Sequence, residues 1–248
     1  MCGIVGIIGR EEVSERLMGG LRRLEYRGYD SAGICTLVDG EFERRRAEGK
    51  LNNLAAELEK ESLPGVVGIA HTRWATHGAP TVGNAHPHLV DGVALVHNGI
   101  IENFRPLREE MKALGRTFQS ETDSEVVAHL VSNELQKGLT PQQAVANVLP
   151  RLEGAFAITI MFKDHPDLLI GARMGAPLTV GYGEGENYLG SDAIAVAPWT
   201  QRIAYLEEGD WAVVRRDAIQ IYDRGNRPVE REIVESGASS APVEKGNY

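Results

Sequence analysis

The chain begins with Met1-Cys2-Gly3-Ile4-Val5-Gly6-Ile7-Ile8-Gly9. The apolar run after Cys2 predicts a buried strand, and pairing in a sheet fixes a chain end that would otherwise fray. Met1 precedes a small side chain, so we expect its removal, which leaves Cys2 with both a thiol and a free α-amine. An amine with a pKa of about 8 can take the proton of a thiol with a pKa of about 8.5. Cys2 is therefore a candidate nucleophile, the alternative being a small buried residue without a chemical role.

Length and composition narrow the possible classes of protein. The 248 residues suffice for one large domain or two small ones, and the 42% hydrophobic and 25% charged residues are ordinary for a soluble globular chain. A net charge of −9 argues against nucleic acid or an anionic membrane as a partner. No apolar run approaches a membrane span, no secretory signal is visible, and two cysteines are too few for a disulfide framework. We expect a cytoplasmic protein.

Hydrophobic periodicity and capping signals predict helices and strands in separate layers. Helices are expected at 11–25, 51–60 and 104–114, then from a Thr122–Glu125 capping box, and from Thr140-Pro141 to 149. Strands are expected after Cys2 and at 32–38, 41–47, 66–70, 93–96, 155–162, 168–172, 178–182, 187–190, 202–205, 211–215 and 218–222. Residues 192–197 suggest a helical turn. The sequence beyond about Gly225 is polar and suggests a solvated tail or a linker.

Residues 71–92 form a long stretch of polar residues, glycine and proline without an apolar period, which is typical of a functional loop. Five of the seven histidines lie between positions 71 and 97, which raises the question of a metal site. The stretch has no cysteine, a single carboxylate in Asp91, and no pair of histidines at helical spacing. We therefore expect neither a metal nor another cofactor.

Two further patterns complement a thiol nucleophile. His97-Asn98-Gly99 ends a predicted strand, and an Asn amide beside a glycine N–H can converge on one oxyanion, although Asn-Gly is also an ordinary turn. Arg73 carries a planar guanidinium suited to a carboxylate, and Asp123 suits an ammonium. Their alternatives are a surface arginine and a helix cap. Trp74 is either a lid over the loop or an anchor in the core.

Five segments, present together and in this order, carry a resemblance to a known family: Cys2-Gly3-Ile4-Val5-Gly6, Arg22-Arg23-Leu24-Glu25-Tyr26-Arg27-Gly28-Tyr29-Asp30-Ser31-Ala32-Gly33, His71-Thr72-Arg73-Trp74-Ala75-Thr76-His77-Gly78, His97-Asn98-Gly99-Ile100-Ile101-Glu102-Asn103 and Ser120-Glu121-Thr122-Asp123. Residues 2–235 resemble the glutaminase domain of the glucosamine-6-phosphate synthase family, the isomerizing glutamine–fructose-6-phosphate aminotransferases. This domain is a class II glutamine amidotransferase, one of the N-terminal-nucleophile hydrolases. The residues at 27–33 and 71–78 are those typical of the sugar enzymes and not of the related purine and asparagine enzymes.

The resemblance implies a fold, an activity and a set of roles. The fold is an α+β, four-layer αββα sandwich of two mainly antiparallel sheets between helical layers, and the activity is hydrolysis of L-glutamine to glutamate and ammonia. Four residues would be catalytic: Cys2 as nucleophile with its own amine as base, Asn98 and Gly99 as the oxyanion hole, and Arg27 near the nucleophile, where its alternative is a structural salt bridge. Six would bind or surround glutamine: Arg73, Trp74, Thr76, His77, Asp123 and His86.

The same resemblance implies partners. The family continues into a sugar-isomerase half that binds fructose 6-phosphate, so we expect residues 236–248 to be a tail or the start of a linker to it. On its own the chain should only hydrolyse glutamine, and the full-length enzyme is expected to be a homodimer. Three alternatives remain at this point: a non-catalytic binding module, a metal-dependent amidase that uses the histidine loop, and autocatalytic processing of a longer precursor.

Overall fold

The computed structural model describes residues 2–238, in which the strand after Cys2 is central. β1 lies between β4 and β10 in an eight-stranded antiparallel sheet, sheet A, whose strand order is β15-β11-β9-β10-β1-β4-β2-β3. Its strands are β1 (Gly3–Ile8), β2 (Ser31–Val38), β3 (Glu41–Glu48), β4 (Val67–Arg73), β9 (Thr179–Tyr182), β10 (Asn187–Gly190), β11 (Arg202–Tyr205) and β15 (Val234–Glu235).

A second antiparallel sheet, sheet B, packs face to face against sheet A. It has seven strands in the order β14-β13-β12-β8-β7-β6-β5. They are β5 (His88–Val90), β6 (Val93–Ile101), β7 (Gly154–Phe162), β8 (His165–Met174), β12 (Trp211–Val214), β13 (Ile219–Tyr222) and β14 (Pro228–Val229). The long β6–β7–β8 meander is the part of this sheet that carries the candidate site, because Asn98 and Gly99 lie on β6.

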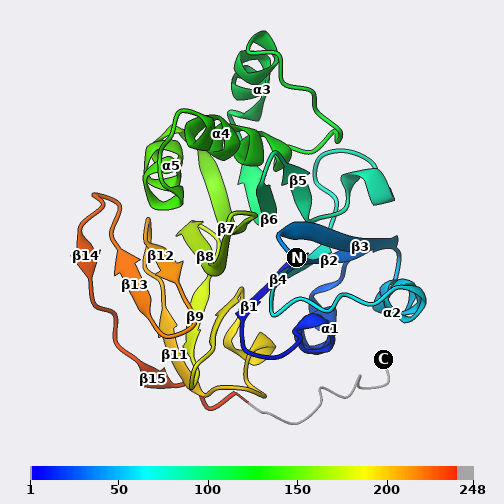
Figure 1. Cartoon of the computed structure of the whole chain (residues 1–248), viewed down its shortest axis with the longest axis vertical. Coiled ribbons are helices and arrows are strands. Elements are labelled where there is room, and N and C mark those ends of the chain that lie inside the picture. The colour runs from blue at the N-terminus through cyan, green and yellow to red at the C-terminus, as the bar shows by residue number, and fades with distance from the viewer. Residues whose placement is uncertain (1, 239–248) are drawn as a thin grey trace.

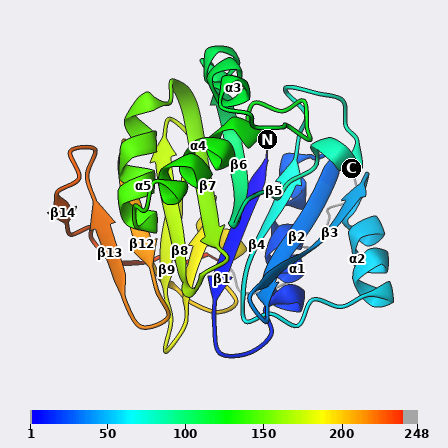
Figure 2. The same ribbon diagram turned by 45° about the horizontal axis from the view of Figure 1, so that its top comes forward.

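Helices cover the outer faces of both sheets (Figures 1 and 2). Residues 2–238 contain α1 (Ser14–Arg23) and α2 (Leu51–Lys60) on sheet A, and α3 (Phe104–Ala113), α4 (Glu125–Gln136) and α5 (Pro141–Val148) on the side of sheet B. Short 3₁₀ turns occupy Glu25–Arg27, Val82–Asn84, Leu149–Arg151 and Ala193–Ala195. The result is the predicted αββα sandwich. None of the helices in the described residues is long and apolar enough to cross a membrane.

The alternation of β1 shows how its sequence produces this layering. Ile4 and Ile8 point into the core between the two sheets, whereas Val5 and Ile7 point into the core under α1 and α2. All four side chains are 0% exposed. A strand that is apolar on both faces must be covered on both, so Gly3–Ile8 is fixed in the interior of sheet A, directly after Cys2.

The structure corrects three local predictions. Thr122 does not form a capping box: α4 begins at Glu125 after Ser124, and the Glu125 carboxylate accepts the N–H groups of Gln119 and Ser120 at 2.8 and 2.7 Å. The 71–92 loop is shorter than expected, because β4 continues to Arg73 and β5 begins at His88. The sheets continue beyond Gly225, since β14 pairs with β13 and β15 pairs with β11.

Other predictions are confirmed. The Thr140 side chain accepts the Gln143 N–H and Pro141 occupies the first turn of α5, as a capping box requires. The helical turn expected at 192–197 is the 3₁₀ turn Ala193–Ala195. Of the predicted 236–248 tail, Ser236 still donates its N–H to the carbonyl of Gln201 at 2.9 Å, and residues 239–248 lie outside the described part of the chain.

Candidate active site

Cys2 lies at the open end of β1, where several predicted site residues meet. The Trp74 N–H donates to Cys2 Sγ at 3.1 Å, and the thiol in turn lies 3.6 Å from the Trp74 carbonyl oxygen. The Cys2 carbonyl accepts from Asn98 Nδ2 at 3.2 Å and from Arg27 Nη1 at 3.3 Å. The side chain of Cys2 is therefore held by Trp74, the residue after β4, and its backbone is held by β6 and by the 3₁₀ turn after α1.

The environment of Cys2 favours a protonated thiol at rest. Burial raises the pKa of the Cys2 thiol, and the Trp74 N–H and the Arg73 guanidinium only partly offset this effect. A thiol must lose its proton to act as a nucleophile, so this site needs a base. Met1, and with it the state of the Cys2 α-amine, lies outside the described residues.

The Asn98 amide is oriented by a buried histidine that sequence reasoning did not assign. Asn98 Nδ2 donates to Cys2, so its Oδ1 is the atom that faces His71 Nε2 at 3.0 Å. His71 is 0% exposed, and burial lowers its pKa to about 3, so the ring is neutral. Nε2 must then carry the proton, and His71 donates it to Asn98. This contact keeps the NH₂ of Asn98 turned toward Cys2.

Gly99 is required at its position by the backbone. Its φ is +115°, and a Cβ there would lie 2.0 Å from the Ala155 carbonyl oxygen on the neighbouring strand. Only glycine accommodates both features. The ordinary turn proposed as the alternative for Asn98-Gly99 is excluded, because both residues lie inside β6, which continues to Ile101.

Arg73 is buried, at 4% exposure, and binds the loop that follows it. Its Nη1 donates to the Ala79 carbonyl at 3.1 Å, and its Nη2 donates to the carbonyls of His77 and Gly78. The surface-arginine alternative is therefore wrong. Since a guanidinium has five N–H donors, two remain for a carboxylate.

Asp30 anchors the same loop from the other side, and sequence reasoning did not assign it a role. Its Oδ2 accepts the Ala75 N–H at 2.5 Å, and its backbone N–H donates to the Arg73 carbonyl at 2.7 Å. Trp74, between these two anchors, is 54% exposed, and its ring lies against Gly28. Trp74 is thus not a core anchor but a surface side chain at the rim of the site.

Asp123 is buried at 2% exposure and is not a helix cap. Its Oδ2 accepts the Ile101 N–H at 2.8 Å, and its Oδ1 lies 3.8 Å from His77 Nδ1. One carboxylate oxygen is therefore held by the end of β6, and the other faces a side chain of the loop. This arrangement leaves Oδ1 able to accept from a cation that enters between them.

Arg27 forms the salt bridge that was its structural alternative, and it also lies beside Cys2. Its Nη2 forms an ion pair with Asp192 Oδ2 at 2.7 Å, while its Nη1 reaches the Cys2 carbonyl and the Ser191 Oγ, both at 3.3 Å. Ser191 Oγ also accepts the Ile4 N–H at 3.0 Å. Arg27 and Ser191 together fix the first residues of the chain, which is a structural role immediately beside the candidate nucleophile.

The buried histidines cluster behind the site, and two of them are stacked. The rings of His71 and His86 lie 4.2 Å apart, and His86 Nδ1 accepts the His97 N–H at 3.1 Å. Burial lowers the pKa of His88 to about 3 and lowers the pKa values of His86 and His97. No three His, Cys, Asp or Glu side chains within residues 2–238 are grouped as a metal site would require.

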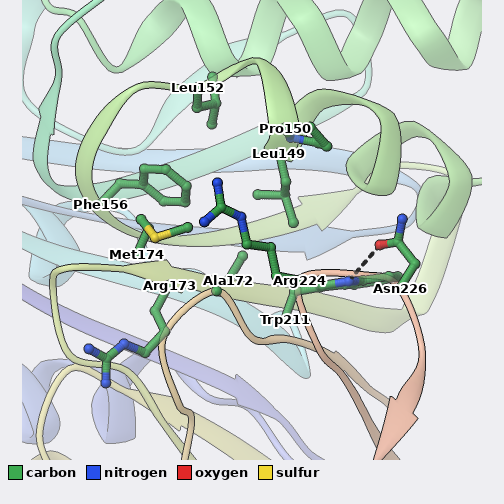
Figure 3. A pocket seen from close by; sticks show the side chains of 11 residues that line it. Leu149, Pro150, Leu152, Phe156, Ala172, Arg173, Met174, Trp211, Arg224 and Asn226 are labelled. Atoms are coloured by element: carbon green, nitrogen blue, oxygen red, sulfur yellow. Dashed lines mark hydrogen bonds between the residues drawn. The ribbon is translucent and has the colours of Figure 1, made fainter.

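The candidate pocket brings the predicted residues together. Its lining includes eight of them: Cys2, Arg73, Trp74, Thr76, His77, His86, Gly99 and Asp123. The other two, Asn98 and Arg27, hold the Cys2 carbonyl. The open space is only about 10 Å³, room for about one water. A roomier cavity of about 110 Å³ lies elsewhere, between the 3₁₀ turn after α5 and sheet B, and shares no lining residue with this site (Figure 3).

Comparison with solved structures defines the class. The glutamine phosphoribosylpyrophosphate (PRPP) amidotransferase of B. subtilis matches 90% of this chain and 49% of its own length, with a TM-score of 0.77 and 28% identity. The fold is that of the class II amidotransferases among the N-terminal-nucleophile hydrolases. The chain belongs to the glutamine amidotransferase domain family, whose sequence pattern matches residues 72–197.

Curated relatives show which kind of amidotransferase this chain is similar to. Over its whole length the chain is 66% identical to the glutamine–fructose-6-phosphate aminotransferase [isomerizing] of Zymomonas mobilis and 60% identical to that of Brucella abortus. It spans 41% of the length of each of these relatives.

Proposed function

We propose that this chain hydrolyses the side-chain amide of L-glutamine to glutamate and ammonia through a thioester on Cys2. The observation that carries the proposal is the meeting of a thiol, an Asn98 amide, the Gly99 backbone and an Asp123–Arg73 pair around one pocket. A thiol beside oxyanion donors is the minimum needed for acyl transfer. The two ionic side chains match the two ends of an α-amino acid.

The proposed reaction begins with proton transfer. After loss of Met1, the Cys2 α-amine takes the thiol proton and Sγ attacks the amide carbon of glutamine. Asn98 Nδ2 and the Gly99 N–H meet the negative charge on the carbonyl oxygen. The ammonium of Cys2 then protonates the leaving nitrogen, so that ammonia departs and a γ-glutamyl thioester remains. Water, deprotonated by the same amine, hydrolyses the thioester and regenerates the thiol.

Substrate binding in this proposal uses two buried, oppositely charged side chains, Asp123 and Arg73, together with the loop. Asp123 Oδ1 accepts from the α-ammonium, and the remaining donors of Arg73 bind the α-carboxylate. Thr76, His77 and Trp74 belong to the loop that covers glutamine, and His86 supports the site from behind. Since the pocket holds about one water, the segment from Trp74 to Ala79 must move outward before glutamine enters and close afterwards to exclude water.

The proposal extends to the whole protein. Its relatives are named glutamine–fructose-6-phosphate aminotransferases, and we propose that the ammonia serves a sugar-isomerase half that converts fructose 6-phosphate to glucosamine 6-phosphate. In that form the protein would act as a cytoplasmic homodimer. Residues 2–235 would be its glutaminase domain, and 236–248 would lead into the linker.

The function is tested by glutamate release from glutamine. The wild-type chain should turn over, the Cys2→Ala variant should bind glutamine without releasing glutamate, and thiol alkylation should abolish activity. Resistance to alkylation together with loss of activity on chelation would instead support a metal-dependent amidase. Glutamine binding without any turnover by a chain that lacks Met1 would support a non-catalytic module.

A further inference from the structure

A second cavity, of about 110 Å³, lies between the 3₁₀ turn that follows α5 and sheet B (Figure 3). Its walls are largely apolar and come from Leu149, Leu152, Phe156, Ala172, Met174 and Trp211. An apolar cavity of about 150 Å³ binds benzene, so this cavity of about 110 Å³ can enclose part of a small ring, the rest of which would face solvent. Nothing in the proposed glutaminase chemistry uses it.

One cation is placed over these apolar walls. Figure 3 shows the Arg224 guanidinium among Leu149, Phe156 and Met174, with its stem running up from the β13–β14 turn. The stem packs on Gly209, where a Cβ would lie 2.9 Å from the Arg224 Cβ. Gly209 also has a φ of +84°. Because Gly209 has no side chain, the aliphatic part of Arg224 can pack directly against its backbone.

The neighbouring carboxylates are already paired with other arginines. Four ion pairs show this: Glu207 with Arg231 at 3.2 Å, Glu208 with Arg173 at 3.0 Å, Asp210 with Arg231 at 2.8 Å and Asp223 with Arg227 at 2.7 Å. Within residues 2–238, Arg224 has no hydrogen-bond or ion-pair partner. The cavity thus combines apolar walls with an exposed arginine that has solvent, and no protein group of the described chain, as its partner.

We propose that this cavity binds a small monocarboxylate with a flat apolar body. The carboxylate would receive paired N–H donors from Arg224, whose planar geometry matches it, and the body would lie against Phe156, Met174 and Trp211. Apolar walls with one placed polar group are typical of small-molecule sites. This site is independent of the proposed reaction, although Phe156 is the strand partner of Gly99.

Benzoate is the probe, and the protein is the 248-residue chain. We expect saturable binding by calorimetry with a dissociation constant on the order of 1 mM, as a ligand with few atoms allows. Benzamide has the same shape without the charge and should bind at least about tenfold more weakly, since one ionic contact is worth about 1.4 kcal/mol or more. Acetate, which has the charge without the ring, should be weaker still.

Two variants and a resonance locate the site. Arg224→Met keeps the aliphatic stem and removes the charge, and it should weaken benzoate binding at least about tenfold. Arg10 is an exposed arginine outside the cavity, so Arg10→Met should leave benzoate binding unchanged. Benzoate should shift the indole N–H resonance of Trp211, which donates to Asn226 at 3.0 Å, but not those of Trp74 and Trp199. No saturable binding, equal affinities for benzoate and benzamide, unchanged binding to Arg224→Met, or a shift at Trp74 instead of Trp211 would each overturn the proposal.

Discussion

Asn98 illustrates how one side chain depends on two neighbours. Its NH₂ is held near Cys2 only because its oxygen is occupied by His71. A free amide could turn by 180°, and its oxygen would then face the charge that develops during acyl transfer. The donor that the proposed reaction needs is therefore positioned before glutamine arrives.

Replacing Asn98 with alanine tests the oxyanion role. We expect kcat for glutamine hydrolysis to fall by about 10²–10³, the usual cost of losing one oxyanion donor, with KM nearly unchanged. The His71 donor is left unsatisfied, so the melting temperature should fall slightly as well. Steady-state kinetics and thermal denaturation measure both effects, and an unchanged kcat would remove Asn98 from the catalytic group.

His71 is predicted to act through Asn98. His71→Phe removes the donor and should lower kcat about tenfold or more while KM stays the same, whereas His71→Gln offers an N–H donor in a similar place and should recover part of the loss. His129→Phe is the matched control, because this buried histidine lies tilted against Phe118 and 3.4 Å from the Glu125 carboxylate, and it does not contact Asn98. Equal losses of kcat in His71→Phe and His71→Gln would point to a packing role only.

The loop after β4 is the element on which substrate entry depends. It leaves the sheet at Arg73 and is fastened by Asp30 at Ala75 and by Arg73 at three carbonyls between His77 and Ala79. Both anchors lie in the framework, and the segment between them is largely exposed. Such a segment can open without disturbing the sheets, because few buried contacts are lost.

Removing the Asp30 anchor should therefore affect binding more than chemistry. Asp30→Ala should raise KM for glutamine about tenfold, since a charged hydrogen bond contributes about 1.5–3 kcal/mol to the closed state, with a smaller change in kcat. Hydrogen exchange of the 74–79 amides should become faster. Asp167→Ala, which breaks an exposed ion pair with Arg215, is the control. Unchanged exchange in Asp30→Ala would mean that Asp30 does not hold the loop.

The elements that sequence could predict are those with local signals. The apolar run of β1, the amphipathic α1 and the Thr140 capping box are encoded in neighbouring residues and are confirmed. The short strands β14 and β15 are two residues each, too short for a periodic signal, and β15 pairs with β11, about 30 residues earlier in the chain. The Thr122 capping box failed because Glu125 bonds Gln119 and Ser120 instead.

The site residues also divide into those that the sequence alone marks and those that only the structure reveals. Cys2, Arg73, Asn98, Gly99 and Asp123 are recognisable because they stand in distinctive segments, and the structure brings them to one pocket. His71 and Asp30 lie in the same segments but received no role, because their partners are 27 and 45 residues away in the chain. Which atom a side chain holds becomes visible only in three dimensions.

At the scale of the whole molecule, the buried histidines make stability depend on pH. Burial lowers the pKa of His71 and of His88 to about 3 and lowers those of His86 and His97, whereas an unfolded histidine titrates at about 6.5. Below pH 6.5 the unfolded chain binds more protons than the folded one, so stability is fully present above that pH and is lost as the pH falls toward 3.

Each of these four histidines should lower the free energy of unfolding by up to about 1.4 kcal/mol per pH unit below pH 6. Urea denaturation at pH 8, 7, 6 and 5 should show a plateau above pH 7 and a steep decline below pH 6. His88→Gln should reduce the slope, and His165→Gln, at an exposed position on β8, should not. A free energy that stays constant from pH 7.5 to 5.5 would refute this account.

The central claim is that the start of the chain, fixed in the middle of sheet A, supplies both the nucleophile and its base. Intact mass spectrometry after treatment with a glutamine-derived electrophile tests it most directly. The account predicts a chain that lacks Met1 and carries one adduct, located on Cys2 and absent from Cys2→Ala, while buried Cys35 stays unmodified. Retention of Met1 in an active chain, or an adduct on any other residue, would contradict it.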